Sequence, residues 1–286
     1  MLQTTQPQRF DNMTVDMKKH YIDLKFKDPT NNLRMRYRDS HGKGPPIILL
    51  HGGGFTGPIN WGKHYEYLSN KFRVISPDHR GHGDTNNPRG TFGTFKQLAD
   101  DMAVFIKQMG FERPVIMGHS SGAATSLHLS IYYPELLSKQ ILIGIHPNMG
   151  VSEKHKQGLK DVYGNKDYRL PPTKWQLIKH DYRLALWSWT MHSKVNWSEL
   201  IRTAWPMWAA KWDLSKSDYA LVKCPTLVVW GQDEDFGSNE DHQMLQDLIP
   251  DAKGIMVARG VDNKKVPHIF VSESPKKLQK VIHDFL

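Results

Sequence analysis

The chain has 286 residues, and 39% of them are hydrophobic, which suits one sizeable domain with a small insertion. Cys224 is the only cysteine, so an internal disulfide is excluded and a reducing, cytoplasmic compartment is expected. The net charge is +9, but the basic residues are scattered, so we expect no nucleic-acid partner. No apolar run is long enough to span a membrane, and residues 1–20 lack the apolar core of a secretory signal.

Strand and helix patterns alternate along the chain, which favours a mostly parallel sheet with helices on both faces. The first two strands flank a turn at residues 29–32 and predict an antiparallel hairpin. The expected strands are 22–26, 33–37, 47–50, 72–76, 115–117, 141–145, 226–230 and 254–257, and the expected helices are 94–109, the segment after Ser120, 241–248 and 275–286. We therefore predict the α/β class, with a mostly parallel eight-stranded sheet flanked by helices.

Residues 147–217 interrupt this alternation and are predicted to form an all-helical insertion, a lid or cap. The core would then comprise residues 1–146 and 218–286. One helix is expected at 174–189, and a second helical face is expected to carry Trp197, Ile201, Trp205, Trp208 and Trp212. The insertion holds seven of the nine tryptophans of the chain: Trp175, Trp187, Trp189, Trp197, Trp205, Trp208 and Trp212. These side chains would pack the insertion onto the core, and some are expected to roof an apolar pocket.

A glycine-flanked serine stands where an expected strand gives way to a helix. The apolar run at 115–117 is followed by Gly118, His119, Ser120, Ser121 and Gly122. A serine at such a turn is held on a strained backbone, with its hydroxyl projecting from the sheet edge. Side chains at the two glycine positions would collide with the neighbouring strand and helix. We therefore predict that Ser120 is a nucleophile, the alternative being a structural turn.

A serine hydroxyl needs a base, usually a histidine that a carboxylate orients. Among the 15 histidines, His268 is favoured because it follows the last expected strand and precedes the closing helix. His283 lies inside that helix, where a surface or packing role is expected, and His242 is placed on a surface helix.

The acid should follow the strand at 226–230, because sheet-edge sites of this kind run serine, acid, histidine along the chain. Asp233, Glu234 and Asp235 are consecutive there. Aspartate and glutamate can both orient an imidazole, so the chemistry leaves the choice among the three open.

An oxyanion hole requires two backbone N–H groups that point at the developing negative charge. Ser121, directly after the nucleophile, supplies one of them. The glycine-rich turn after the strand at 47–50 supplies the other, with Gly53 as the first choice and Gly54 as the second. A phosphate cradle would instead need a lysine and a Ser/Thr at the following helix start, and neither is present.

Together these residues resemble the α/β-hydrolase superfamily, in its cap-bearing esterase and lactonase-like branch. The matching motifs are His51-Gly52, Asp78 to Gly83, Gly118 to Gly122, and the closing set His268, Glu273 and Pro275. The resemblance puts Glu234 where members usually carry aspartate, which makes Glu234 the preferred acid and leaves Asp233 and Asp235 open. Pro267 replaces the glycine that usually precedes the histidine.

The resemblance implies a serine hydrolase that cleaves a carboxylic ester or lactone of a bulky apolar or aromatic molecule through an acyl-enzyme. No cofactor and no metal are expected. The oligomeric state is left open, with a homo-oligomer as one possibility. One alternative is a carbon–carbon bond hydrolase acting on ring-cleavage products, whose glycine turn this chain shares. A second is a ligand-binding receptor on the same scaffold. A metal-dependent lactonase, suggested by the residues from Asp78 to His82, lacks the usual histidine spacing.

Overall fold

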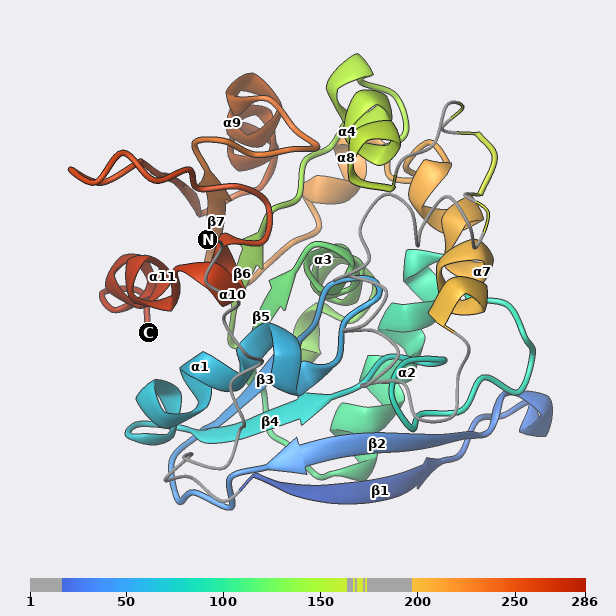
Figure 1. The fold of residues 1–286 in the computed structure, drawn as a ribbon. Coiled ribbons are helices and arrows are strands. Elements are labelled where there is room, and N and C mark those ends of the chain that lie inside the picture. The colour runs from blue at the N-terminus through green and yellow to red at the C-terminus, as the bar shows by residue number, and fades with distance from the viewer. Residues whose placement is uncertain (1–16, 164–166, 168, 172, 174–196) are drawn as a thin grey trace, which may run out of the picture.

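An eight-stranded sheet runs through the molecule in the order β1-β2-β4-β3-β5-β6-β7-β8 (Figure 1). The computed structural model describes residues 17–163, 167, 169–171, 173 and 197–286. The strands are β1 Lys18–Leu24, β2 Leu33–Asp39, β3 Pro46–Leu50, β4 Arg73–Pro77, β5 Val115–His119, β6 Lys139–Ile143, β7 Thr226–Gly231 and β8 Ala252–Val257. β1 with β2 and β2 with β4 pair antiparallel, and the other neighbours pair parallel. The predicted fold class is therefore confirmed.

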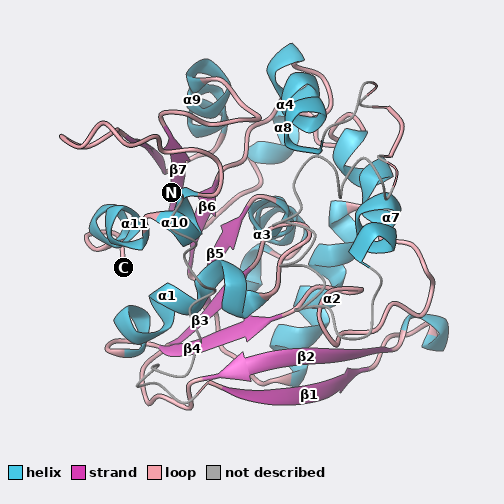
Figure 2. Ribbon diagram, viewed as in Figure 1, coloured by secondary structure: helices cyan, strands magenta, loops and turns pink. Residues whose placement is uncertain are grey.

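Helices cover both faces of the sheet (Figure 2). The described ones are α1 Gly57–Ser69, α2 Phe95–Gln108, α3 Ser121–Tyr132, α4 Glu153–Tyr163, α7 Trp197–Ala209, α8 Lys216–Tyr219, α9 Asn239–Leu248, α10 Phe270–Glu273 and α11 Pro275–Ile282. Side chains alternate along β3, so Ile47 and Leu49 pack with α1, whereas Ile48 and Leu50 pack with α2 and α3. Two apolar cores, one on each face, hold the carboxyl ends of the strands in fixed positions.

The element boundaries differ from the sequence prediction where local backbone chemistry intervenes. β6 ends at Ile143 and not at 145, because Gly144 leaves the strand with φ +65°. α1 was not predicted, since Gly57, Pro58 and Gly62 weaken its helical pattern, although proline suits the first turn. The predicted turn at 29–32 is a 3₁₀ helix, Pro29–Asn31, preceded by the cap Asp28.

The regular elements described between β6 and β7 are α4, α7 and α8. Trp175, Trp187, Trp189 and the helix expected at 174–189 lie outside the described residues. α7 ends at Ala209, so the prediction that Trp212 continues its face is wrong. Trp212 instead stacks on His128 of α3, with ring centroids 5.6 Å apart, and packs this part of the chain onto the core.

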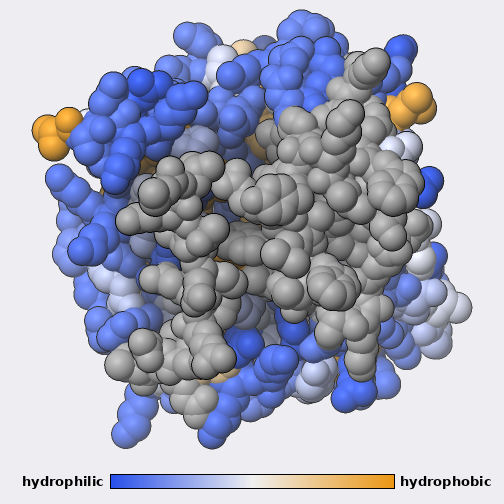
Figure 3. All heavy atoms as spheres, viewed as in Figure 1, coloured by the Kyte–Doolittle hydropathy of each residue, from blue (hydrophilic) through white to orange (hydrophobic). Residues whose placement is uncertain are grey.

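The described residues expose a few large hydrophobic side chains. Large exposed hydrophobic side chains, such as Val261 and Leu170, are separate in the sequence, and the described atoms in Figure 3 are largely hydrophilic. Among the helices that the structure describes, none has the length and apolar character needed to cross a membrane.

Candidate active site

Ser120 lies at the turn between β5 and α3, on a backbone that L-residues rarely adopt. Its φ and ψ are 52° and −120°, and its N–H donates to the Ile143 carbonyl at 2.8 Å. A non-glycine residue keeps such a conformation only where its surroundings fix it. The end of β6 thus holds the serine backbone, and the side chain stays partly exposed.

The two glycines that flank Ser120 allow close approach of neighbouring backbone. A Cβ on Gly118 would lie 2.3 Å from the Gly122 carbonyl oxygen. A Cβ on Gly122 would lie 2.1 Å from the Leu50 carbonyl oxygen at the end of β3. Both distances are far shorter than a van der Waals contact. A side chain at either position would therefore collide with neighbouring backbone, as the sequence predicted.

We expect Gly122→Ala to lower the free energy of unfolding by about 2 to 3 kcal/mol, because the added methyl group forces α3 away from β3. Urea unfolding monitored by tryptophan fluorescence measures this loss. Gly260→Ala is the matched control, since its Cβ would meet the ends of two flexible side chains, Asp262 Oδ1 at 3.1 Å and Lys277 Nζ at 3.8 Å. The control should stay within about 0.5 kcal/mol of the wild type. Equal stability of both variants would contradict the close approach.

His268 and Glu234 face each other across the loops that follow β8 and β7. His268 Nδ1 donates to Glu234 Oε1 at 2.5 Å, and both side chains are buried. The same oxygen accepts the N–H groups of Asp235 and Phe236 at 3.1 and 3.3 Å. Because Nδ1 carries the proton, Nε2 is left as an acceptor. Gly144 admits the imidazole, since a Cβ there would lie 2.9 Å from His268 Cε1.

The other two predicted acids have different partners. Asp233 forms an ion pair with Arg259 and accepts the Val266 N–H at 2.9 Å. Asp235 Oδ2 accepts the backbone N–H of His268 at 3.0 Å. Of the three consecutive carboxylates, Glu234 is therefore the one that contacts the imidazole.

Hydrogen bonds hold the His268 peptide on both sides. Its N–H is bound by Asp235, and its carbonyl accepts from His119 Nε2 at 2.9 Å. Burial lowers the pKa of His119 to about 3, so this ring is neutral, and a hydrogen bond to the His268 carbonyl requires its one proton on Nε2. The Phe236 ring meets the imidazole edge-on at 4.6 Å. Since His119 directly precedes Ser120, one side chain links the serine turn to the histidine loop, a contact that the sequence did not reveal.

The charges of the pair reinforce each other. Burial raises the pKa of Glu234, but the attraction of His268 and its hydrogen bond outweigh burial and lower that pKa to about 2. For His268, burial lowers the pKa, because it disfavours the charged imidazolium. The Glu234 carboxylate raises the pKa by more than this, so the pKa of His268 lies above its ordinary value. The arrangement therefore stabilises an imidazolium, the form that a general base acquires when it takes a proton.

The glycine-rich turn after β3 leaves one N–H available. Its other N–H groups are engaged: Gly52 donates to Asn60 Oδ1 at 2.7 Å, Gly54 to His82 Nε2 at 3.1 Å, and Phe55 to the Gly52 carbonyl at 3.2 Å. Within the described part of the chain, the Gly53 N–H donates to no atom. A Cβ on Gly53 would lie 2.9 Å from Ser121 Oγ, so the two candidate oxyanion donors are neighbours. Ser121 opens α3, where the first N–H groups have no intrahelical acceptor.

α7 lies over this glycine turn. A Cβ on Gly53 would lie 2.2 Å from Trp208 Cζ2, and one on Gly54 would lie 3.1 Å from Ile201 Cδ1. Trp205 packs edge-on against Trp208, and both rings are buried. Trp208 therefore lies against the backbone that carries the Gly53 N–H, with Trp205 packed on it.

Three buried histidines behind Glu234 were not predicted. His146 lies between His155 and His242, with ring centroids 5.4 and 5.7 Å away. The placement of His242 on the surface is wrong, because it is fully buried and stacks on Trp230 at 5.3 Å. That contact depends on how the polar helix α9 docks against β7, which helix periodicity does not show. In the described ranges, no group of three or more potential ligands is arranged to hold a metal ion.

The sequence matches the profile of the alpha/beta hydrolase fold over residues 45–260. A 2-hydroxy-6-oxo-6-(2'-aminophenyl)hexa-2,4-dienoic acid hydrolase from Metapseudomonas resinovorans is 29% identical over 238 residues, which cover 78% of this chain and 79% of the relative. An uncharacterized protein of Mycobacterium tuberculosis is 32% identical over 102 residues. That match covers 36% of this chain but only 29% of the mycobacterial protein.

Solved structures share the fold. A thermophilic esterase from Thermogutta terrifontis matches with a TM-score of 0.69 and 22% identity, over 94% of this chain and 97% of the esterase. A meta-cleavage product hydrolase from Pseudomonas fluorescens IP01 matches with a TM-score of 0.70 and 20% identity, over 88% and 94% of the two chains. Since the profile match spans most of the sequence, from the start of β3 to beyond β8, the chain belongs to the alpha/beta hydrolase fold family.

Proposed function

We propose that this protein is a serine hydrolase that cleaves a carboxylic ester or lactone through an acyl-enzyme. The observation that carries the proposal is the set of three side chains that follow the carboxyl ends of the parallel strands β5, β7 and β8. Ser120 lies on a strained turn after β5, and the buried His268–Glu234 pair follows β8 and β7. In this proposal Ser120, His268 and Glu234 are the catalytic nucleophile, base and acid.

In the first half-reaction, Ser120 Oγ attacks the carbonyl carbon while His268 Nε2 takes the hydroxyl proton. The N–H groups of Gly53 and Ser121 donate to the oxyanion of the tetrahedral intermediate. The imidazolium then gives its proton to the leaving alcohol oxygen, and the ester bond breaks. In the second half-reaction, water attacks the acyl-enzyme with His268 again as the base. The acid is released and the Ser120 hydroxyl is restored.

We further propose that residues 147–217 form a cap that selects the substrate. The closeness of Trp208 and Ile201 to the glycine turn supports this, because both would border a carbonyl bound at Gly53. Large buried aromatic side chains favour a bulky apolar or aromatic substrate over a small polar one.

A second candidate is hydrolysis of a carbon–carbon bond next to a carbonyl, with the same side chains. The relative that favours it is the dienoic acid hydrolase of Metapseudomonas resinovorans, which matches over 78% of this chain. Both reactions would use the same nucleophile, so the relative turnover of their substrates distinguishes them.

Turnover of three substrate types tests the proposal: p-nitrophenyl esters with acyl groups from acetyl to benzoyl, aromatic lactones, and 2-hydroxy-6-oxo-6-phenylhexa-2,4-dienoate. We expect kcat/KM for the best ester or lactone to exceed that for the dienoate by at least about 100-fold, about 3 kcal/mol of transition-state discrimination. The reverse ranking would establish the carbon–carbon hydrolase. Saturable ligand binding with no turnover of any substrate would favour a receptor.

The pH dependence of kcat/KM should report the His268–Glu234 pair. His268 acts as a base only when neutral, and the carboxylate raises its pKa above the ordinary value. Activity should therefore rise with pH and reach a plateau only above an apparent pKa higher than about 6.5. Glu234→Gln removes the charge that raises this pKa, so the residual activity should reach its plateau at lower pH. An unchanged profile in that variant would contradict the pairing.

A further inference from the structure

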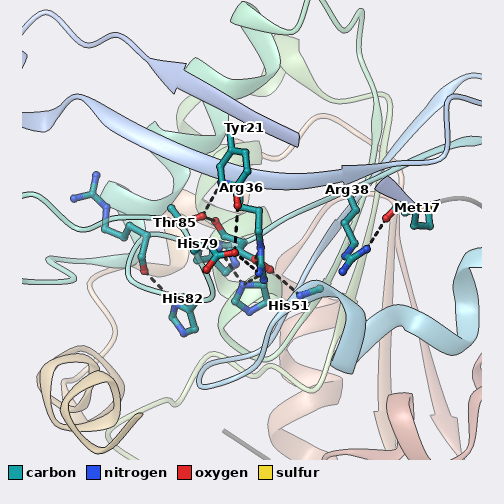
Figure 4. A network of polar contacts seen from close by, with 12 residues as sticks. Met17, Tyr21, Arg36, Arg38, His51, His79, His82 and Thr85 are labelled. Atoms are coloured by element: carbon teal, nitrogen blue, oxygen red, sulfur yellow. Dashed lines mark hydrogen bonds and ion pairs between the residues drawn. The ribbon is translucent and has the colours of Figure 1, made fainter. Parts of the chain in front are cut away.

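Two histidines bind the glycine turn after β3 to the turn after β4, and each accepts a backbone N–H from the other turn. His51, in the first turn, accepts the His79 N–H at 3.0 Å. His82, in the second turn, accepts the Gly54 N–H at 3.1 Å. The rings of His51 and His82 lie 4.9 Å apart, and Figure 4 shows them grouped with His79 near Arg36.

The backbone fixes the tautomer of both rings. His51 Nδ1 lies 2.8 Å from the Gly52 carbonyl, and His82 Nδ1 lies 3.0 Å from the Arg80 carbonyl. Carbonyl oxygens only accept, so each Nδ1 carries the proton and each Nε2 presents its lone pair. Both rings are buried, at 0% and 3% exposure, so these contacts are shielded from water.

The second turn is itself anchored to the sheet. Asp78 forms a buried ion pair with Arg36 of β2, and its other oxygen accepts the N–H of Gly57 at the start of α1 at 2.9 Å. Thr85 donates to the Asp78 carbonyl and accepts the Arg36 N–H, both at 2.9 Å. His82 therefore projects from a rigid base toward a glycine turn whose Gly54 has φ +76°.

We propose that His82 is a positioning residue for the oxyanion hole. By binding the Gly54 N–H, it fixes the peptide plane next to Gly53 and leaves the Gly53 N–H to point at the substrate carbonyl. The inference rests on the proposed function, because the Gly53 N–H is an oxyanion donor only if Ser120 is the nucleophile. Without the His82 acceptor, the Gly53–Gly54 peptide can rotate at little steric cost, since glycine tolerates both signs of φ.

Three His82 variants separate positioning from general support of the fold. His82→Gln places an amide oxygen near the former Nε2 and can still accept the Gly54 N–H. His82→Asn places its amide near the former Nδ1 and cannot reach Gly54. His82→Phe keeps the ring volume but has no acceptor. Each is measured for kcat and KM on the best ester, and for inhibition by phenylboronic acid, whose tetrahedral serine adduct places an oxygen in the oxyanion hole. All values are scaled to the sites titrated by a fluorophosphonate.

We expect kcat per titrated site to fall about 10- to 100-fold in His82→Phe and His82→Asn, with KM within about threefold of the wild type. Boronate affinity should fall by a similar factor, and His82→Gln should recover most of both losses. A fall in titrated sites alone, with kcat and boronate affinity per site unchanged, would overturn the inference, since it indicates only a less stable fold. Ser120→Ala in the same assays isolates the proposed function. If that variant keeps its activity, the serine mechanism fails; if only the His82 variants behave as wild type, the positioning role fails.

Discussion

Ser120→Ala should lower kcat by at least about 10⁴-fold, leaving the residual catalysis that the oxyanion donors and substrate binding supply. The alanine removes only the hydroxyl, and the backbone strain at φ 52° is retained or slightly relieved. We therefore expect KM and stability to stay close to the wild type. Steady-state hydrolysis of the best p-nitrophenyl ester, with thermal unfolding alongside, measures both quantities.

Ser130→Ala is the matched control, because Ser130 lies in the last turn of α3, where its hydroxyl donates to the Leu127 carbonyl and accepts from Gln140 Nε2, away from the carboxyl ends of the strands. Its kcat should stay within about twofold of the wild type, since the substitution of a buried serine that touches no group of the site acts on stability and not on chemistry. A Ser120→Ala variant that retains a tenth or more of its activity would rule out an acyl-enzyme at this position.

Glu234→Gln should lower kcat by about 10³- to 10⁴-fold. The amide keeps the size of the side chain but removes the charge that stabilises the imidazolium, and it can turn its N–H₂ toward His268 and select the wrong tautomer. The pair is buried, so water does not replace the lost interaction. Single-turnover hydrolysis of a p-nitrophenyl ester resolves the slowed acylation step.

Asp233→Asn and Asp235→Asn are the variants with which Glu234→Gln is compared, because each also replaces a carboxylate by an amide, one residue before or after Glu234. Asp233→Asn loses the ion pair with Arg259 and should act mainly on stability. Asp235→Asn retains an oxygen that can accept the His268 N–H, so its kcat should fall less than about tenfold. If Glu234→Gln turned over normally while either neighbour lost activity, the acid would be misassigned.

Local sequence chemistry predicted the strand-to-helix turn at Ser120 because its determinants are local. A buried strand, two glycines and a run of small residues specify the backbone whatever the rest of the chain does. The fold class, a mostly parallel sheet of eight strands, followed from the alternation of strand and helix patterns, whereas the order of the strands in the sheet did not. The positions of His268 and the acid cluster followed from their places after the last two parallel strands.

The choice among three consecutive carboxylates could not be predicted in the same way. Their side chains leave one loop in different directions, and Arg259 and the His268 backbone determine which carboxylate goes where. Those partners lie about 25 to 35 residues further along the chain, and the pairing of β8 with β7 brings them to the loop. For the same reason the contacts of His119 and His82 escaped sequence reasoning, since each is a side chain that binds the backbone of a distant loop.

The most direct test of the serine mechanism is intact-protein mass spectrometry after reaction with a fluorophosphonate, followed by peptide mapping. The mechanism predicts one covalent adduct per chain, located on Ser120, absent in Ser120→Ala and formed at least about 100-fold more slowly in Glu234→Gln. No adduct on the folded wild-type protein, or an adduct on a different residue, would contradict it.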